Sequence, residues 1–325
     1  MKNRVVISAL CVISFVACSA SLSYTQSTSA PPPSTNYEKI ALLKWYPAIQ
    51  TRAVFATGAG PNGIAFDGSS VWVANSGAQT LTKLRASDGT MLVTVDLPGE
   101  PWALAFDGAN IWVGNYSGGV TKVRASDGTV LNTFTTGSSV LAIAFDGANI
   151  WAANGFGNFV TKLRAADGTI LGTYTVGDYP WGLAFDGANI WVANWNSNTL
   201  TKLRASDGAT LGTYQTRYEP DAVAFDGNNI WVTNYGASSV TKFRAIDGAN
   251  LGTFAVGPCP DAIAFDGASL WVANYGGSGN TITKIRASDG ANMGTFQVGG
   301  GAVGVAFDGA NIWVTATFDG TVSKL

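Results

Sequence analysis

The sequence predicts an all-β fold, a seven-bladed β-propeller of four-stranded blades, and three observations predict it. A block of about forty residues runs seven times through the chain, and a Phe-Asp-Gly tripeptide marks each copy. Each block holds short runs rich in β-branched and aromatic residues, which Gly, Asn or Asp close. No stretch outside the N-terminus shows the 3.6-residue apolar period of a helix. Four strands in roughly 40–45 residues is the size of one propeller blade.

The phenylalanines of these tripeptides fix the period. They are Phe66, Phe106, Phe145, Phe185, Phe225, Phe265 and Phe307, at intervals of 40, 39, 40, 40, 40 and 42 residues. Because one period covers nearly the whole chain, residues 49–325 are expected to form a single ring rather than two domains.

The residues from 180 to 214 illustrate the four strands expected in each block. The first run (180–187) alternates small and bulky residues, which suits a crowded ring axis. The second (188–194) is apolar nearly throughout, as expected of a sheet covered on both faces. The third (198–208) alternates, which predicts that one of its faces is wet, and the fourth (210–214) completes the blade.

The N-terminal end of the repeat region is expected to close the ring. Seven copies of the first three runs are present, but only six copies of the fourth run follow them. Residues 51–61 match residues 171–180 in the spacing from Gly to Pro and in an aromatic residue. The N-terminal strand should therefore complete the last blade, and closure removes exposed strand edges.

Residues 1–48 are expected to export the protein and tether it. Lys2 and Arg4 precede an apolar run (5–17) that is too short to span a bilayer, which predicts a signal peptide over residues 1–18. The sequence Phe-Val-Ala-Cys ending at Cys18 resembles a bacterial lipoprotein box, so Cys18 is a candidate lipidation site; ordinary cleavage after Ala20 is the alternative. Residues 19–48 are rich in Ser, Thr and Pro and should form a disordered tether. We expect a periplasmic, cell-surface or secreted protein.

The composition narrows the range of partners. The net charge of −2 predicts no nucleic-acid surface, and it leaves an N-terminal lipid anchor as the only membrane contact. The recurring Lys, Arg and Asp residues are interpreted as structural, in turns and ion pairs. Cys259 is the only cysteine of the repeat region, so no disulfide is expected within it. We predict no cofactor and no metal, and we expect a monomer.

The candidate site comes from positions at which the repeats differ. Four residues before each of the marking phenylalanines, the chain holds Asn62, Trp102, Leu141, Trp181, Asp221, Asp261 and Val303. The loops after the second strands hold Tyr116, Phe156, Trp195, Tyr235, Tyr275 and Phe318. Propeller topology places both sets at one mouth of the central channel. We expect aromatic side chains on one arc and Asp221, Asp261 and Glu219 on the opposite arc.

Two interpretations of this mouth stay open. Variable aromatic residues on loops of a rigid scaffold suit recognition of a protein, peptide or glycan. For that function the candidate residues are Asn62, Trp102, Tyr116, Trp181, Trp195, Asp221, Tyr235, Asp261 and Tyr275. The alternative is that Trp102 and Trp181 only fill the channel while the aspartates cap loops.

Two resemblances add to this interpretation. Residues 190–194, 198–203 and the Val176-Gly177 pair resemble the YVTN-type (YncE-like) repeats of bacterial exported propellers, which are mostly binding or surface proteins. The chain also resembles virginiamycin B lyase, a seven-bladed propeller that uses a His base and a Mg²⁺ site. The present sequence contains no histidine, so that base and any Ser-His-Asp triad are excluded.

Three functions follow, of which the first is preferred. The first is a binding module that uses its loop face. The second is a metal-dependent lyase or lactonase-like enzyme, to whose metal site Asp221 and Asp261 would contribute. The third is a structural surface protein with no ligand site. We assign no catalytic residue.

Overall fold

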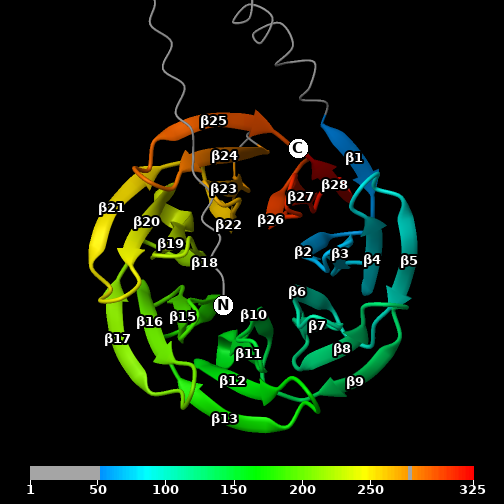
Figure 1. Cartoon of the computed structure of the whole chain (residues 1–325), viewed down its shortest axis with the longest axis horizontal. Coiled ribbons are helices and arrows are strands. Elements are labelled where there is room, and N and C mark those ends of the chain that lie inside the picture. The colour runs from blue at the N-terminus through cyan, green and yellow to red at the C-terminus, as the bar shows by residue number, and fades with distance from the viewer. Residues whose placement is uncertain (1–51, 277–279) are drawn as a thin grey trace, which may run out of the picture. The chain divides into compact units, whose positions relative to one another are not determined.

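The computed structural model describes residues 52–276 and 280–325, which form seven four-stranded antiparallel sheets arranged in a ring around a channel (Figure 1). The predicted seven-bladed β-propeller is therefore confirmed. The expected signal peptide, Cys18 and the whole tether lie outside the described residues. Within the described ranges, no helix has the length and apolar character needed to cross a membrane.

The four strands of a blade are arranged in order from the channel to the rim. The innermost strands are β2 (Pro61–Phe66), β6 (Pro101–Phe106), β10 (Val140–Phe145), β14 (Pro180–Phe185), β18 (Pro220–Phe225), β22 (Pro260–Phe265) and β26 (Ala302–Phe307). The second strands are β3 (Ser70–Asn75), β7 (Asn110–Asn115), β11 (Asn149–Asn154), β15 (Asn189–Asn194), β19 (Asn229–Asn234), β23 (Ser269–Asn274) and β27 (Ile312–Ala316).

The outer half of each blade carries the remaining strands. The third strands are β4 (Thr80–Arg85), β8 (Val120–Arg124), β12 (Phe159–Arg164), β16 (Thr199–Arg204), β20 (Ser239–Arg244), β24 (Thr281–Arg286) and β28 (Thr321–Lys324). The rim strands are β5 (Met91–Asp96), β9 (Val130–Phe134), β13 (Ile170–Thr175), β17 (Thr210–Gln215), β21 (Asn250–Ala255), β25 (Asn292–Gln297) and β1 (Ala53–Ala56). Two 3₁₀ turns, η1 (Gly155–Gly157) and η2 (Tyr235–Ala237), lie in loops that follow second strands.

The ring closes through β1, as predicted. This strand pairs with β28 in antiparallel register, from Ala53 opposite Lys324 to Ala56 opposite Thr321. The Thr57 backbone N–H donates to the Gly320 carbonyl over 2.9 Å and extends the ladder. The first described strand is thus the rim strand of the last blade (Figure 1), and no blade of the ring keeps an unpaired third strand.

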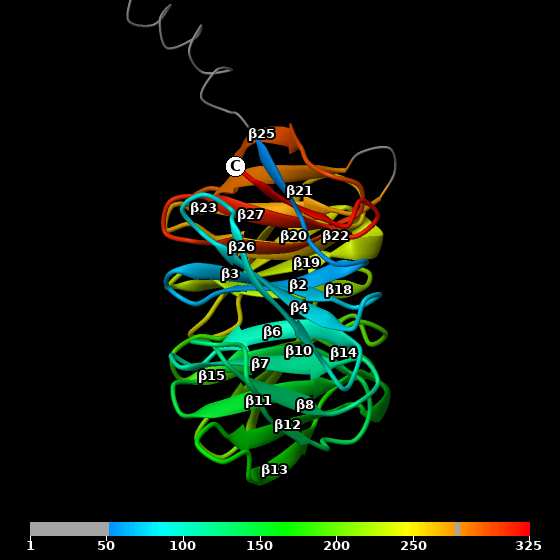
Figure 2. The ribbon, with the colours of Figure 1, turned by 90° about the vertical axis from the view of Figure 1, so that its right-hand side faces the viewer.

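Neighbouring blades pack through a recurring tryptophan of the second strand. Trp72 on β3 is fully buried and packs with Ile111 and Val113 on β7 of the next blade. The six other blades place their tryptophans in the same way, and all but Trp271 are fully buried. The predicted packing role of these residues is confirmed. Seen edge-on, the resulting ring is a disc, flattened along its channel (Figure 2).

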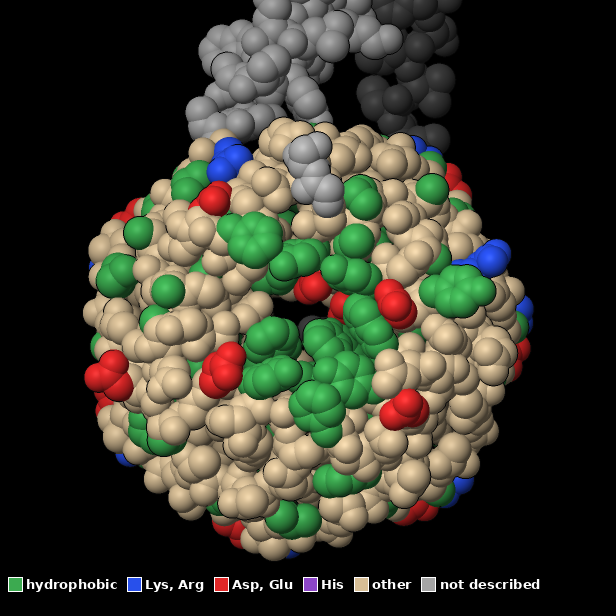
Figure 3. Space-filling model, turned by 180° about the vertical axis from the view of Figure 1, so that it is seen from behind, with side chains coloured by type: hydrophobic (Ala, Val, Ile, Leu, Met, Phe, Trp, Pro, Cys, Tyr) green, Lys and Arg blue, Asp and Glu red, His purple; other side chains and the backbone are tan. Residues whose placement is uncertain are grey.

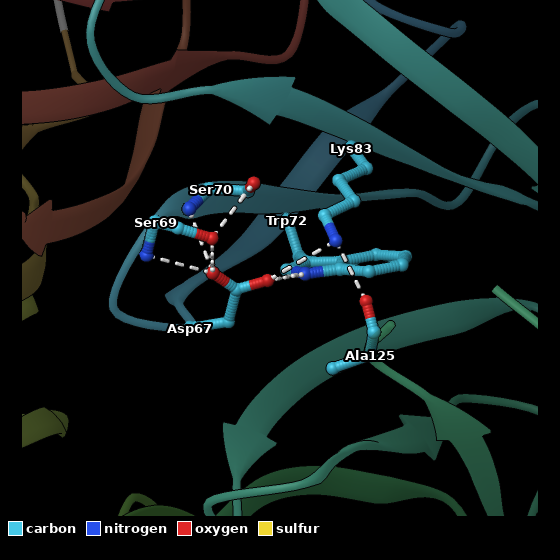
Figure 4. A network of polar contacts seen from close by, with 6 residues as sticks. All are labelled: Asp67, Ser69, Ser70, Trp72, Lys83 and Ala125. Atoms are coloured by element: carbon cyan, nitrogen blue, oxygen red, sulfur yellow. Dashed lines mark hydrogen bonds and ion pairs between the residues drawn. The ribbon is translucent and has the colours of Figure 1, made fainter. Parts of the chain in front are cut away.

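A polar network surrounds each of these tryptophans, and Figure 4 shows the copy around Trp72. The indole N–H of Trp72 donates to Asp67 Oδ2 over 2.8 Å, while Asp67 Oδ1 accepts from the backbone N–H groups of Ser69 and Ser70. The Lys83 ammonium lies 5.0 Å from the Trp72 ring centroid and donates to the Ala125 carbonyl of the next blade. The recurring arginines pair with turn aspartates, as Arg85 does with Asp88 over 3.0 Å. The recurring charges are therefore structural, as interpreted from the sequence.

The prediction of a wet face on the third strand is wrong. On β4, the residues from Leu81 to Leu84 are buried, and Lys83 is 9% exposed. The aliphatic stem of Lys83 covers Trp72 while its ammonium finds a carbonyl acceptor, so an alternating charged residue does not require solvent here. The alternating wet face belongs to the rim strands, such as β13 and β17.

Candidate functional site

A break in the β-ladder sets the position of each variable residue. In all seven innermost strands the pairing with the second strand is regular at the Phe end and shifts immediately after the first residue of the strand. The residue that falls in this irregularity is the variable one, for example Trp181 between Pro180 and Gly182. A bulge re-aims a side chain relative to the regular pleat, and here it turns the variable residues toward the channel.

These residues line a cavity of about 610 Å³ at one mouth of the channel. Eight of the nine candidate residues line it, namely Asn62, Trp102, Trp181, Trp195, Asp221, Tyr235, Asp261 and Tyr275. Tyr116 does not line the cavity; its ring packs in a tilted arrangement against Trp102, at 5.1 Å between centroids. Figure 3 shows the hydrophobic side chains gathered around the channel opening, with acidic groups inside it. A cavity of this volume is typical of small-molecule sites.

The aromatic side chains form a continuous arc. Trp181 is its centre, with ring centroids 5.1 Å from Trp195 and 6.3 Å from Trp102. Beyond Trp195 the arc continues to Tyr235 at 5.0 Å, and from Tyr235 to Tyr275 at 6.5 Å. Tilted and edge-to-face pairs of this kind stabilise one another, so the arc is a preformed surface.

Asp221 and Asp261 form an acidic pair on adjacent innermost strands, β18 and β22. Asp221 is 2% exposed, and its Oδ2 atom has no hydrogen-bond partner among the described residues. Burial, followed by the nearby charge of Asp261, raises the pKa of Asp221 well above its ordinary range. The indole of Trp181 faces Asp221 and opposes part of this rise. Burial likewise raises the pKa of Asp261, to about 7. Both carboxyls therefore favour the protonated form more than an ordinary aspartate does.

Asn62 is held in place by hydrogen bonds at the mouth. Its Nδ2 donates to Ser76 Oγ over 2.7 Å, and Ser76 Oγ donates to the Gly60 carbonyl over 2.9 Å. The backbone carbonyl of Asn62 accepts from Thr315 Oγ1 of the neighbouring blade. Asn62 is therefore a fixed polar group across the channel from the aromatic arc's centre.

The expected division of the mouth into opposite arcs is wrong. Asp221 is the direct neighbour of Trp181, and Tyr235 and Tyr275 belong to the same blades as the two aspartates. The acids and the aromatic rings therefore form one mixed wall. Glu219 does not line the cavity; it lies in the preceding loop at a φ of +55°, where its backbone N–H donates to Asn198 Oδ1.

Sequence reasoning missed two residues that contact this wall without lining the cavity. Tyr179 extends the arc, with ring centroids 5.4 Å from Trp181 and 5.2 Å from Phe156. Cys259 lies beside Tyr235, and a hydrogen bond between the two contributes, after burial, to a raised Tyr235 pKa. Both residues directly precede the first proline of an innermost strand, a second position at which the repeats differ, and this variation could have identified them.

The described residues hold no group of three or more His, Cys, Asp or Glu side chains with the arrangement of a metal site. The two aspartates on their own do not provide the ligand number of a divalent ion. A lactonase-type metal centre built from carboxylates therefore finds only part of its ligand set at this mouth.

Comparison with known proteins supports the fold but assigns no function. No protein-family model matches the chain, and no curated protein matches it. Among solved structures, the chain is similar to one described as "Streptogramin B lyase structure", with 20% sequence identity and a TM-score of 0.70. The similarity covers 84% of this chain and 96% of that chain. At this identity the likeness shows a shared seven-bladed β-propeller. It agrees with the predicted resemblance to a lyase propeller in fold, while the YVTN-type assignment stays a prediction.

Proposed function

We propose that this β-propeller is an exported binding module that takes its ligand at the channel mouth. One observation carries the proposal: the blades depart from their common pattern in the residues that line this cavity. Elsewhere they repeat closely, since a lysine covers the second-strand tryptophan in all seven blades, at 4.6–5.3 Å from its ring centroid. A scaffold kept uniform around a variable, concave wall is typical of a recognition surface.

The chemistry of the wall supports ligand binding more than channel filling. Trp102, Trp181 and Trp195 are each partly exposed and line the cavity rather than closing it. Their faces suit a flat apolar group, and the carboxyls of Asp221 and Asp261 add polar contacts of fixed direction. A peptide, a glycan or another ligand with one apolar and one polar side fits this arrangement.

A second candidate function is a lyase or lactonase-like reaction. It is favoured by the fold shared with the streptogramin B lyase structure and by two adjacent carboxyls with raised pKa values, of which one can donate a proton while the other accepts one. The missing histidine disfavours it. Turnover of a cyclic ester that depends on an added divalent cation would favour this candidate over the binding module.

The proposal is tested by thermal shift with peptides, glycans and divalent cations. A ligand of the mouth should raise the melting temperature of the wild-type protein and not that of the folded Trp102→Ala/Trp181→Ala/Asp221→Ala variant. The matched control is Tyr218→Ala/Glu219→Ala, which removes an exposed aromatic residue and an acid outside the cavity, and it should keep the shift. Equal shifts in all three proteins would place binding elsewhere and refute the proposal.

A further inference from the structure

The cavity has an unbalanced charge. Asp221 and Asp261 line it, whereas no Lys or Arg does among the residues that the structure describes. The Oδ2 atom of Asp221 is buried without a hydrogen-bond partner in that part of the chain. An ionised carboxylate that is removed from water without a partner is strongly destabilised, so this pair favours a positive group beside it.

The wall beside the aspartates provides a second kind of contact for a positive charge. Trp181 faces Asp221, and the rings of Trp195, Tyr235 and Tyr275 continue the arc over the same blades. The electron-rich faces of Trp and Tyr attract cations, and groups of them recognise substituted ammonium ligands. Carboxylates and aromatic faces thus act on the same charge.

Other ligand classes fit this wall less well. A divalent metal ion takes about six to eight oxygen ligands, and two carboxylates provide few of them. An anion would be repelled by the aspartates. A neutral sugar would stack on the tryptophans but would leave the charge of the pair without compensation.

From these contacts we infer that the channel mouth binds an organic cation, an alkylammonium group seated on the aromatic arc and against Asp221 and Asp261. The inference rests on the proposed function and names its ligand class. The group can belong to a free small molecule or to a lysine-type side chain of a peptide. A cation beside the carboxyls favours their ionised form, so any proton held by either aspartate leaves to solvent on binding.

The first test compares a cation with its neutral counterpart. Choline and 3,3-dimethylbutan-1-ol have nearly the same shape, but only choline is charged. By isothermal titration of the full protein, choline should bind about tenfold or more tightly than the alcohol, the difference expected when a desolvated charge gains a carboxylate partner. Equal affinities would overturn the inference.

Variants test whether choline binds at the wall formed by the aspartates and the aromatic rings. Asp221→Asn/Asp261→Asn keeps the shape of the pair and removes its charge, and it should weaken choline binding roughly tenfold or more. Glu219→Gln, an acid on the adjoining loop that does not line the cavity, should leave the affinity unchanged. Retained affinity in the double variant would overturn the inference. A thermal melt shows whether this variant is folded. The Trp181→Leu/Trp195→Leu variant removes the aromatic contact independently and should also lose choline binding.

A pH series tests the exchange of proton for cation. The indole of Trp181 faces Asp221 and the phenol of Tyr235 lies near Asp261, while Tyr275 and Cys259 lie beside Tyr235. None of these groups is positively charged, and no Lys or Arg lines the cavity among the described residues. Choline affinity should therefore fall as pH is lowered from 8 to 5 in the wild type. A pH-independent affinity would contradict the exchange.

A final comparison separates the sources of the cation and the two levels of the proposal. Choline binding alone indicates a free ammonium ligand, whereas tighter binding of a short peptide with trimethyllysine indicates a peptide. If neither ammonium probe binds, but a glycan or divalent cation binds the wild type and not the Trp102→Ala/Trp181→Ala/Asp221→Ala variant, the organic cation is refuted and the binding module is kept. Absence of any ligand that the triple variant loses refutes both.

Discussion

Aspartate residues of this protein have pKa values that move in opposite directions. Asp186 is partly buried, and that burial raises its pKa, but hydrogen bonds from the Trp191 indole, Asn189 and the Ala188 N–H outweigh the rise and lower it. Asp221 is buried more completely, has the acid Asp261 nearby and far fewer donors, and its pKa is raised. Burial and a neighbouring acid raise the pKa of a carboxyl, and hydrogen-bond donors lower it, so the balance differs between the scaffold aspartates and those of the channel mouth.

The raised pKa of Asp221 predicts a pH-dependent gain from Asp221→Asn. Because the folded protein holds this proton more tightly than the unfolded chain, its free energy of unfolding falls as pH rises above the ordinary aspartate range of about 4. Asparagine does not titrate and escapes this loss. The melting temperature of Asp221→Asn should therefore exceed that of the wild type by more at pH 8 than at pH 5. A difference that is constant from pH 5 to pH 8 would contradict the assignment.

Rim strands hold neighbouring blades together through a glycine turn. Tyr174 on β13 packs against Gly208, in the turn between β16 and β17 of the next blade, where a Cβ atom would overlap the Tyr174 ring. Phe134 lies in the same way on Gly168, and Phe55 of the closing strand lies on Gly89. The turn glycines between the third and fourth strands are therefore required for space as well as for their positive φ.

Two glycine substitutions separate these requirements. Gly208 and Gly187 both have positive φ, +76° and +96°, but no atom lies within 4 Å of a Cβ built on Gly187. Gly187→Ala should destabilise the protein by about 1 kcal/mol through backbone strain. Gly208→Ala should add a further loss of roughly 1–3 kcal/mol from overpacking against Tyr174. Equal losses in chemical denaturation would show that the Tyr174 contact contributes nothing.

The closed ring is a property of the whole molecule, because its last blade joins the two ends of the propeller. Phe55 of β1 lies with its ring 5.6 Å from Trp313 of β27, and β1 supplies the rim strand that β28 would otherwise lack. Strand closure therefore combines ladder hydrogen bonds with a core contact, and it places the two most distant parts of the described chain side by side.

Removing the closing strand should open the ring. Deletion of residues 49–57 exposes the edge of β28, so we expect aggregation and loss of a single cooperative melt. Deletion of residues 37–45, equal in length and within the predicted tether, is the matched control and should remain monomeric in size-exclusion chromatography. A soluble, cooperatively melting 49–57 deletion would refute the role of β1.

The repeated Asp–Trp contact predicts how the stability of the protein falls at acidic pH. Seven aspartates accept a hydrogen bond from the indole of a second-strand tryptophan, and the pKa of each aspartate is lowered. Each ionised aspartate therefore stabilises the folded protein at pH values above its ordinary pKa. This stabilisation is lost as pH falls through the lowered pKa. Asp186→Asn should cost roughly 1–3 kcal/mol at pH 7 and less at pH 3, as measured by denaturation. Exposed Asp96→Asn should change stability little at either pH.

The sequence by itself determined the repeat, the strand number and the closure, because each depends on patterns within a few residues or on a fixed period. It also selected eight residues that line the mouth, since differences among repeats can be read without coordinates. The tertiary structure decided how these residues meet. The bulge beside Pro220 and the packing of β18 on β22 bring Asp221 next to Trp181 and Asp261, whereas Glu219, two residues away, lies outside the cavity. Such neighbours come from different blades, about forty residues apart, and only the ring brings them together.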